Sequence, residues 1–374
     1  MTFGVHYNAE IYYKRSTDGG TSWGADTRLT NNSAYSSWPS VSVSGSVVHV
    51  VWVDSRDGNG ETYYKRSTDG GISWGTDTRL TNNTAPSYTP SGAASGQVVH
   101  VVWNDNHEGN EEIYYIRSTD GGVSWGTETR LTNNSAQSGS ASVSVSVSSV
   151  HVVWTDLRDG NYEIYYKRST DGGTSWGADT RLTNDPNISY NPSGAVSGQV
   201  VHVVWYDNRD GNFEMYYKRS TDGGLSWGAD IRLTNAPGNS EFPSVSVSGT
   251  VVHVVWQDNR DGNDEIYYKR DPTGGVTEIK DIELEVPKEF SLSQNYPNPF
   301  NPSTVVQFSL PRSESVTLKV FSILGEEIAT LVSNGLSAGT YQVDWNAQGF
   351  PSGIHFYRLQ AGAFIQTRKL ILLR

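Results

Sequence analysis

Four strand-like segments recur in a fixed order along the first three quarters of this chain. In one copy, small residues alternate over 39–44, an unbroken apolar run fills 47–54, and segments rich in aromatic and polar residues follow at 61–67 and 74–81. An apolar run without alternation is typical of a strand that is covered on both faces. The pattern predicts a four-stranded antiparallel unit whose serine-rich first strand lies innermost, where space is limited.

These units repeat every 51 residues. Segment 16–23 reads Ser-Thr-Asp-Gly-Gly-Thr-Ser-Trp, and it returns four times without any insertion. A fixed period of this length indicates a repeat architecture in which each repeat is one supersecondary unit. The pattern Ser-x-Asp-x-Gly-x-x-Trp resembles the Asp-box, or BNR, repeat of sialidase-like β-propellers. The resemblance implies an all-β fold in which each unit is one blade.

The number of blades follows from counting motifs. The second-strand motif His-Val-Val-Trp occurs five times, and the third-strand motif Glu-x-Tyr-Tyr occurs six times. The chain therefore opens partway through a blade. A five-bladed ring could close if the last first and second strands joined the opening third and fourth strands. We expect a sialidase-like propeller of five to six four-stranded blades and favour six, with an incomplete first blade and missing upstream sequence.

The box residues themselves are interpreted as structural. The aspartate can accept hydrogen bonds from backbone N–H groups of the turn, and the two glycines permit the positive φ of a tight hairpin. The tryptophan is expected to pack as an apolar plug under the turn. These residues are Asp18, Trp23, Asp69, Trp74, Asp120, Trp125, Asp171, Trp176, Asp222 and Trp227.

Composition removes several classes of function. The formal net charge of −12 disfavours nucleic acid and anionic membranes as electrostatic partners. Cysteine is absent, which removes disulfides, thiol chemistry and cysteine-ligated metals. No apolar run reaches the ~18 residues of a membrane-spanning helix, and the first residues lack the pattern of a signal peptide.

The last part of the chain has a different character. Residues 295–304 read Asn-Tyr-Pro-Asn-Pro-Phe-Asn-Pro-Ser-Thr, which is too rich in proline for a helix or a central strand. Five or six alternating strands follow, including 305–310, 316–321, 340–345 and 354–359, and they suggest a small antiparallel sandwich.

With the basic and apolar end at 368–374, this region resembles the C-terminal sorting domain of type IX secretion cargo. The resemblance implies an Ig-like sandwich that an outer-membrane translocon recognises, with release or attachment to lipopolysaccharide afterwards. It also implies a secreted or surface protein of a Gram-negative bacterium. We expect a propeller over 1–276, a linker or final strand over 277–290, and the sorting domain over 291–374.

A candidate binding face follows from strand parity. Because successive strands run antiparallel, turns between second and third strands share one face with the loops between units. This face carries the variation between repeats, and loops on a rigid scaffold commonly bind ligands. Exposed aromatic rings there could stack on sugars or a peptide. The candidate ligand-binding residues are Tyr35, Trp38, Tyr88, Tyr162, Tyr190, Tyr206, Phe213, Phe242, Arg56, Arg158, Arg209 and Arg260.

The four arginines belong to a recurring Asp-x-Arg-Asp-Gly-Asn turn, as at 54–59. It could be a ring of oxygen ligands for Ca²⁺, a ring of polar groups for a glycan, or an Asp–Arg pair that closes a turn. One unit departs, with His107 and Glu108 in place of the arginine and aspartate. The second-strand histidines are interpreted as core residues, because five identical copies around a ring cannot converge on one centre.

Catalysis would need unlike residues at one place. The resemblance to sialidases implies an arginine triad, a tyrosine–glutamate pair and an acid/base aspartate, but here the charged residues recur equally in every unit. We assign no catalytic residue and no cofactor other than the Ca²⁺ of the first interpretation. The hypothesis is a secreted binding or adhesion propeller for glycan or another extracellular polymer. The alternatives are a sialidase-like glycosidase with key residues in missing upstream sequence, and a structural display scaffold.

Overall fold

A computed structural model describes residues 8–271, 289–336 and 339–373 of the chain. It divides into two compact units, Met1–Glu278 and Ile279–Arg374. Each unit is described by itself. Most of the predicted linker over 277–290 lies outside the described residues.

The first unit contains six antiparallel sheets, of which four are four-stranded. The innermost strands are β3 (Ser36–Ser44), β7 (Ser87–Ser95), β11 (Ser138–Ser146), β15 (Ser189–Ser197) and β19 (Ser240–Ser248). The second strands are β4 (Val47–Asp54), β8 (Val98–Asp105), β12 (Ser149–Asp156), β16 (Val200–Asp207) and β20 (Val251–Asp258). The third strands are β1 (Tyr12–Tyr13), β5 (Glu61–Ser67), β9 (Glu112–Ser118), β13 (Glu163–Ser169), β17 (Glu214–Ser220) and β21 (Glu265–Asp271). The fourth strands are β2 (Thr27–Arg28), β6 (Thr78–Arg79), β10 (Thr129–Arg130), β14 (Thr180–Arg181) and β18 (Ile231–Arg232).

Burial explains why the central strands are so apolar. Seven of the eight residues of β4 are buried, and the same holds for β8, β12 and β16. Each of these strands is covered on both faces by neighbouring sheets, as the unbroken apolar runs predicted. The predicted fourth strand over 74–81 is too long, since β6 has only two residues. The Asp-box turn takes up the residues before it.

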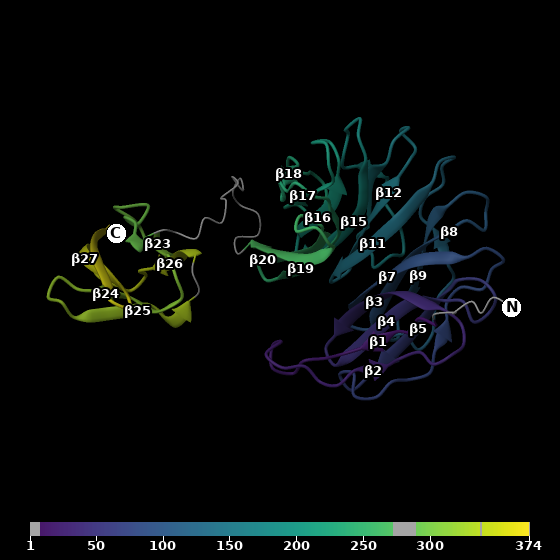
Figure 1. The fold of residues 1–374 in the computed structure, drawn as a ribbon, viewed down its shortest axis with the longest axis horizontal. Coiled ribbons are helices and arrows are strands. Elements are labelled where there is room, and N and C mark those ends of the chain that lie inside the picture. The colour runs from purple at the N-terminus through teal and green to yellow at the C-terminus, as the bar shows by residue number, and fades with distance from the viewer. Residues whose placement is uncertain (1–7, 272–288, 337–338, 374) are drawn as a thin grey trace. The chain divides into compact units, whose positions relative to one another are not determined.

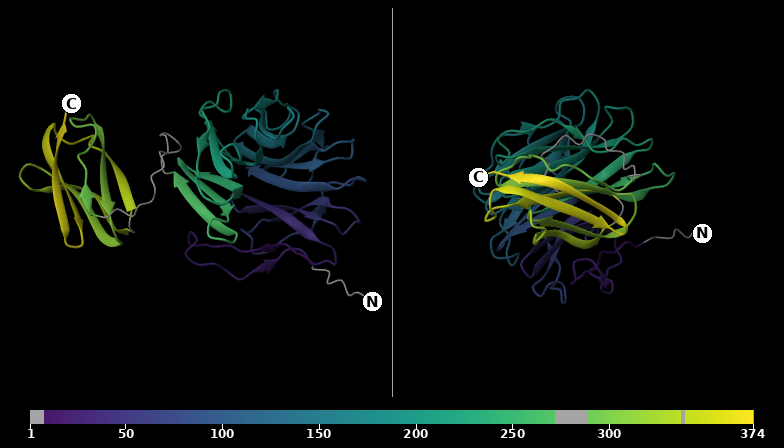
Figure 2. Two further views of the ribbon diagram at one scale, coloured as in Figure 1. Left: turned by 45° about the horizontal axis from the view of Figure 1, so that its top comes forward. Right: turned by 90° about the vertical axis from the view of Figure 1, so that its left-hand side faces the viewer.

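The sheets are arranged as blades of an open propeller. The innermost strands contact one another in the order β3, β7, β11, β15, β19, and Figures 1 and 2 show them side by side around one axis. In a five-bladed ring β20 would pair with β1, but β20 pairs with β21 and β1 pairs with β2. The described residues of the first unit therefore form six sheets, of which the first has only the third and fourth strands.

The second unit is a sandwich of two antiparallel sheets. One holds β22 (Ser291–Leu292), β23 (Ser303–Leu310) and β26 (Gly339–Asn346). The other holds β24 (Glu314–Phe321), β25 (Glu327–Leu336), β27 (Gly353–Ala361) and β28 (Phe364–Leu372). Alternating residues of both sheets form one apolar core, which includes Phe308, Leu318 and Tyr357.

The sequence predicted five or six strands after the proline-rich run, and the described residues there form six, β23 to β28. The structure adds β22, a strand of two residues that precedes this run. Across the described ranges we find no helical segment with the length and hydrophobicity of a membrane span.

Candidate functional site

Hydrogen bonds confirm which loops share a face. The turn after β4 meets the loop between sheets, because Ser55 N donates to Tyr35 O at 3.0 Å and Ser87 N donates to Gly60 O at 2.7 Å. On the opposite face the Asp-box meets the turn between first and second strands, since Gly70 N donates to Ser46 O at 2.8 Å. The variable loops therefore gather at one end of the propeller.

A cavity of about 550 Å³ opens where the innermost strands begin. Each of these strands has a β-bulge at its start, and one residue of the bulge has positive φ. These five residues line the cavity with side chains that differ from unit to unit. They are Trp38, Thr89, Ser140, Asn191 and Phe242, with φ between 45° and 55°.

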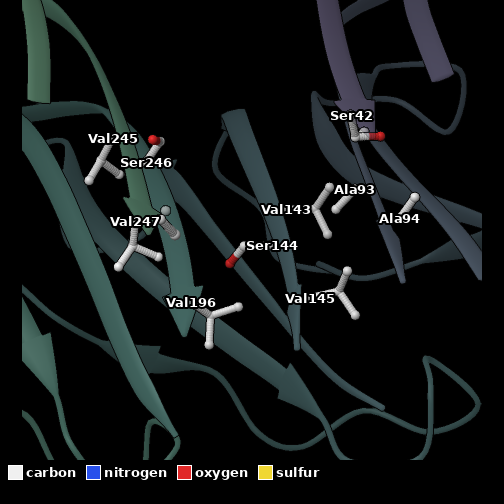
Figure 3. A pocket seen from close by; sticks show the side chains of 13 residues that line it. Ser42, Ala93, Ala94, Val143, Ser144, Val145, Val196, Val245, Ser246 and Val247 are labelled. Atoms are coloured by element: carbon white, nitrogen blue, oxygen red, sulfur yellow. The ribbon is translucent and has the colours of Figure 1, made fainter. Parts of the chain in front are cut away.

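A second cavity of about 350 Å³ lies further along the same strands. Figure 3 shows its lining, which is made of valine, alanine, glycine and serine. Serine hydroxyls such as Ser144 are its only polar side chains. Its lining offers no charged group to bind or activate a substrate, so the loop end of the axis is the better candidate site.

Five of the predicted aromatic residues form one continuous cluster at this end. The ring centroids of Tyr162 and Tyr190 are 5.1 Å apart, and those of Tyr190 and Tyr206 are 5.7 Å apart. Tyr206 also contacts Phe213 at 5.1 Å and Phe242 at 5.9 Å, both edge to face. Tyr206 is buried at the centre of the cluster, whereas Phe242 is half exposed and lines the cavity.

The other three predicted aromatic residues lie apart from this cluster. Tyr35, Trp38 and Tyr88 are each 43% or more exposed, and they belong to the sheets at the beginning of the propeller. Of the three, only Trp38 lines the cavity. The structure thus places a packed aromatic row on one part of the face and single exposed rings on another.

A row of hydrogen-bonded polar groups outside the predicted set begins at Thr89, which lines the cavity. The Thr89 hydroxyl donates to the Asn104 side chain, and the Asn104 amide donates to the Glu111 carboxylate. Burial raises the pKa of Glu111, and burial with nearby Asp264 raises the pKa of Glu241. A signal was present in the sequence, because Thr89 occupies the same repeat position as Trp38.

The four candidate arginines are all engaged by carboxylates. Arg158 binds Asp156 through Nε and Nη2, at 2.8 and 2.6 Å, and reaches Asp179 through Nη1 at 2.8 Å. Its guanidinium also lies 4.4 Å from the ring centroid of Tyr165. Arg56, Arg209 and Arg260 each form the same two-point pair with the aspartate two residues before them. Of the three interpretations of this turn, namely a Ca²⁺ site, a glycan site and an Asp–Arg pair that closes the turn, the geometry matches the Asp–Arg pair.

The same hydrogen bonds occupy the carboxylate oxygens that a cation at this turn would need. Asp54 accepts hydrogen bonds from Arg56, Trp52, Ser36 and Asn32, which leaves neither oxygen free for a metal. Within residues 8–271, 289–336 and 339–373 no group of three or more His, Cys, Asp or Glu side chains could hold a metal ion.

Four of the five second-strand histidines are buried partners of tyrosines. Nδ1 of His100 lies 2.7 Å from the Tyr115 hydroxyl, and His49, His151 and His202 repeat this contact. Burial first, and a nearby arginine second, lower the pKa of each of these four histidines to about 4. They are therefore neutral core residues at neutral pH.

This predicts an acid-sensitive fold. A histidine whose pKa is ~6.5 when unfolded and about 4 when folded favours folding above pH 6.5. That contribution is lost as the pH falls from 6.5 towards 4. We expect the thermal midpoint to fall across this window, and the fall to be smaller in His100→Gln. Raised pKa values of Glu111 and Glu241 act in the opposite direction.

The control is His253→Gln, which changes the same repeat position in the last sheet, where the paired Tyr268 is exposed. Differential scanning calorimetry at several pH values between 4 and 7.5 gives the slope for each protein. Equal slopes for the wild type and His100→Gln would contradict the assignment of the pH dependence to the buried histidines.

The Asp-boxes hold their turns as predicted. Asp69 accepts from Ser67 Oγ at 2.6 Å, from Ser73 N at 2.9 Å and from Ser73 Oγ at 2.5 Å. These hydrogen bonds lower the pKa of Asp69. The box tryptophan has a further role, because Trp74 packs edge to face against Tyr13 of the preceding sheet at 4.9 Å. The box joins two sheets as well as closing one hairpin.

Comparisons with known proteins agree with this architecture. The model of the BNR repeat-like domain matches residues 6–254, and that of the secretion system C-terminal sorting domain matches residues 294–373. A search of curated proteins by sequence gives no match.

Several solved structures are similar. An endo-arabinanase of family GH43 from Bacillus licheniformis has 13% identity and a TM-score of 0.42, over 63% of this chain and 94% of that one. A sialidase from Trypanosoma rangeli has 11% identity and a TM-score of 0.42, over 97% of this chain and 86% of that one. At this level the likeness carries no argument about activity.

Proposed function

The chain belongs to the BNR repeat-like family, and from that premise we propose that its propeller is a secreted binding module for a neutral glycan or a similar extracellular polymer. The observation that carries this proposal is the aromatic cluster of Tyr162, Tyr190, Tyr206, Phe213 and Phe242 beside the cavity at the loop end.

Aromatic clusters of this kind suit flat ligands with apolar faces. A sugar ring presents C–H groups on one face, which pack on an aromatic ring while its hydroxyls stay available for hydrogen bonds. Asn191, Ser140 and Thr89 line the adjacent cavity and supply such partners. The ligand pocket would then combine apolar stacking with a few polar groups, as carbohydrate and other small-molecule sites do.

Charge supports a neutral ligand over an anionic one. The arginines on this face are paired with carboxylates, so they do not offer a free clamp for an acidic sugar. Glu111 and Glu241 likewise supply no positive group, and burial raises the pKa of both. A sialoside carboxylate would find no free cation here, which favours the binding hypothesis over the sialidase-like alternative.

The C-terminal unit supports a role outside the cell. The sorting domain indicates export by a type IX secretion system. We further propose that the translocon at the outer membrane recognises this domain, and that the propeller is then either released or attached to lipopolysaccharide at the surface. In both cases the propeller would meet its polymer in the extracellular space.

The test is a glycan-array screen of the full chain, with turnover of a fluorogenic sialoside measured on the same sample. We expect saturable binding to neutral glycans, no turnover, and at least a ten-fold loss of affinity in Tyr162→Ala and Phe213→Ala. Leu225→Ala is the matched control, because Leu225 is exposed on the opposite, Asp-box face.

Each other outcome identifies a different function. Turnover of the sialoside would overturn the binding hypothesis in favour of a glycosidase. Equal affinity of Tyr162→Ala, Phe213→Ala and Leu225→Ala would show that the ligand binds elsewhere than at the aromatic cluster. Absence of both glycan binding and sialoside turnover would favour a structural display scaffold.

A further inference from the structure

One unit in the interior of the propeller carries a hydrogen-bonded row that its neighbours do not repeat. The row runs from Thr89 in the larger cavity, through Asn104 at the end of β8, to Glu111 in the turn before β9. The equivalents of Asn104 and Glu111 are Val53 and Gly60 in the preceding unit, and Thr155 and Tyr162 in the following unit. The histidine–tyrosine contacts recur in all five units because each sheet needs them. A row that occurs once is not part of that repeated framework.

The next sheet leaves room for the carboxylate that ends this row. Ser138 N donates to Glu111 O at 2.8 Å, which brings the turn against the start of β11. A Cβ at the adjacent Gly139 would lie 3.3 Å from Glu111 Oε1, so the carboxylate uses the space of a side chain. The equivalent residues in other units are Ser37, Tyr88, Tyr190 and Glu241. Glu111 and Gly139 therefore fit each other at this one interface between sheets.

The chemistry of the three side chains fixes the direction of both hydrogen bonds. An ionised carboxylate only accepts, so Asn104 turns its NH₂ group to Glu111 and its carbonyl to Thr89. Asn104 is 4% exposed, so these two neighbours, rather than water, decide how its amide is turned. The Thr89 hydroxyl has one hydrogen, and the Asn104 carbonyl takes it. Towards the cavity Thr89 therefore offers lone pairs only.

We propose that Glu111 is a positioning residue for ligand recognition, which acts through Asn104 to make Thr89 a hydrogen-bond acceptor in the cavity. The site then selects a glycan that turns a free hydroxyl to Thr89. It rejects the same glycan when that hydroxyl is methylated, acylated or replaced by fluorine, because none of these groups can donate. This inference rests on the proposed function, since it concerns the same cavity, and it adds the substitution pattern that the glycan must have.

Glu111→Gln tests the direction of the row without changing its shape. Glutamine carries an NH₂ group that can donate to the Asn104 carbonyl. Asn104 can then turn its own NH₂ group to Thr89, and the Thr89 hydroxyl becomes free to donate into the cavity. The variant should therefore accept a ligand group that has no hydrogen to donate.

Glu108→Gln is the matched control for the lost charge. It removes one negative charge from the same turn, but Glu108 pairs with Arg130 at 2.5 Å and is not part of the row. Thr89→Val is a second variant for the same contact, because it removes the acceptor altogether. It should bind a glycan and its fluorinated form with equal affinity, and it keeps the inference testable if Glu111→Gln fails to fold.

Isothermal titration calorimetry of the full chain measures the selectivity. The probes are the oligosaccharide with the strongest signal in the glycan array and its monodeoxyfluoro forms, in which one hydroxyl at a time is replaced by fluorine. Titrations are made at pH 8, where Glu111 is ionised although burial raises its pKa. For the wild type and Glu108→Gln we expect one fluorinated form to bind at least ten-fold more weakly than the parent. For Glu111→Gln the same form should bind within about three-fold of the parent.

Three results would overturn the inference while the parent glycan still binds and the proposed function stands. They are an equal loss in the wild type and Glu111→Gln, a wild type that binds every fluorinated form as well as the parent, and a Glu108→Gln that behaves as Glu111→Gln does. The last result would assign the effect to charge rather than to the direction of the hydrogen bonds. An array on which the wild type binds no glycan would instead remove the proposed function, and this inference with it.

Discussion

Replacing Asp156 by alanine should lower the free energy of unfolding of the propeller by about 3–5 kcal/mol. The Asp156 carboxylate is fully buried and accepts hydrogen bonds from Trp154 Nε1 at 2.8 Å and from Ser138 Oγ at 2.9 Å. It also neutralises Arg158 through two N–H groups. Its removal leaves the Nε and Nη2 groups of a partly buried guanidinium and an indole N–H without these acceptors, and such unpaired groups are costly.

Urea unfolding followed by tryptophan fluorescence measures this loss. The signal reports mainly on the propeller, because Trp345 is the one tryptophan of twelve that lies in the sandwich. Asp179→Ala is the control, since it removes the other, more exposed carboxylate that Arg158 contacts. We expect it to cost about 1 kcal/mol or less. Similar losses for both variants would show that burial of the Asp156 pair is not the source of the effect.

The second large effect is expected at an interface between sheets, in Gly224→Ala. Gly224 has φ of +84°, and an added Cβ would overlap the Tyr166 hydroxyl of the preceding sheet. The left-handed backbone costs an alanine about 1–2 kcal/mol, and overpacking adds about 1–3 kcal/mol. We therefore expect a loss of about 2–5 kcal/mol in urea unfolding.

Gly20→Ala separates the two contributions to this loss. Gly20 has nearly the same φ of +88°, but no atom lies within 4 Å of the added Cβ. It should therefore lose only the contribution of the backbone, about 1–2 kcal/mol. If the two variants lose equal stability, the tyrosine does not pack against the glycines as described.

Strand positions could be read from the sequence where burial leaves a local pattern. The second and third strands at 47–54 and 61–67 have the predicted bounds, because an apolar run and an Asp-Gly-Asn turn fix both. The fourth strand was predicted too long. Trp74 was counted in that strand, but it packs against Tyr13, which is 61 residues earlier. No local pattern shows a contact at that distance in sequence.

The sequence could predict the face on which the candidate site lies. It could not predict which of its side chains contact one another. Differences between repeats pointed to the positions of Tyr162, Tyr190 and Phe213. Only the structure shows that these rings touch through Tyr206, while Tyr88 stands apart. The sequence places the arginines on the same face, but the second carboxylate partner of Arg56, Arg158 and Arg209 comes from a residue 21 positions later.

The bulges that open onto the larger cavity have a consequence for how this surface can change over time. At each of them the unusual φ belongs to the backbone, while the side chain at that position is tryptophan, threonine, serine, asparagine or phenylalanine. The same conformation therefore accepts large and small, polar and apolar groups. A substitution there alters what the surface presents without altering the strand beneath it. The propeller can accumulate new recognition properties one blade at a time, and duplication of a blade would supply each new position.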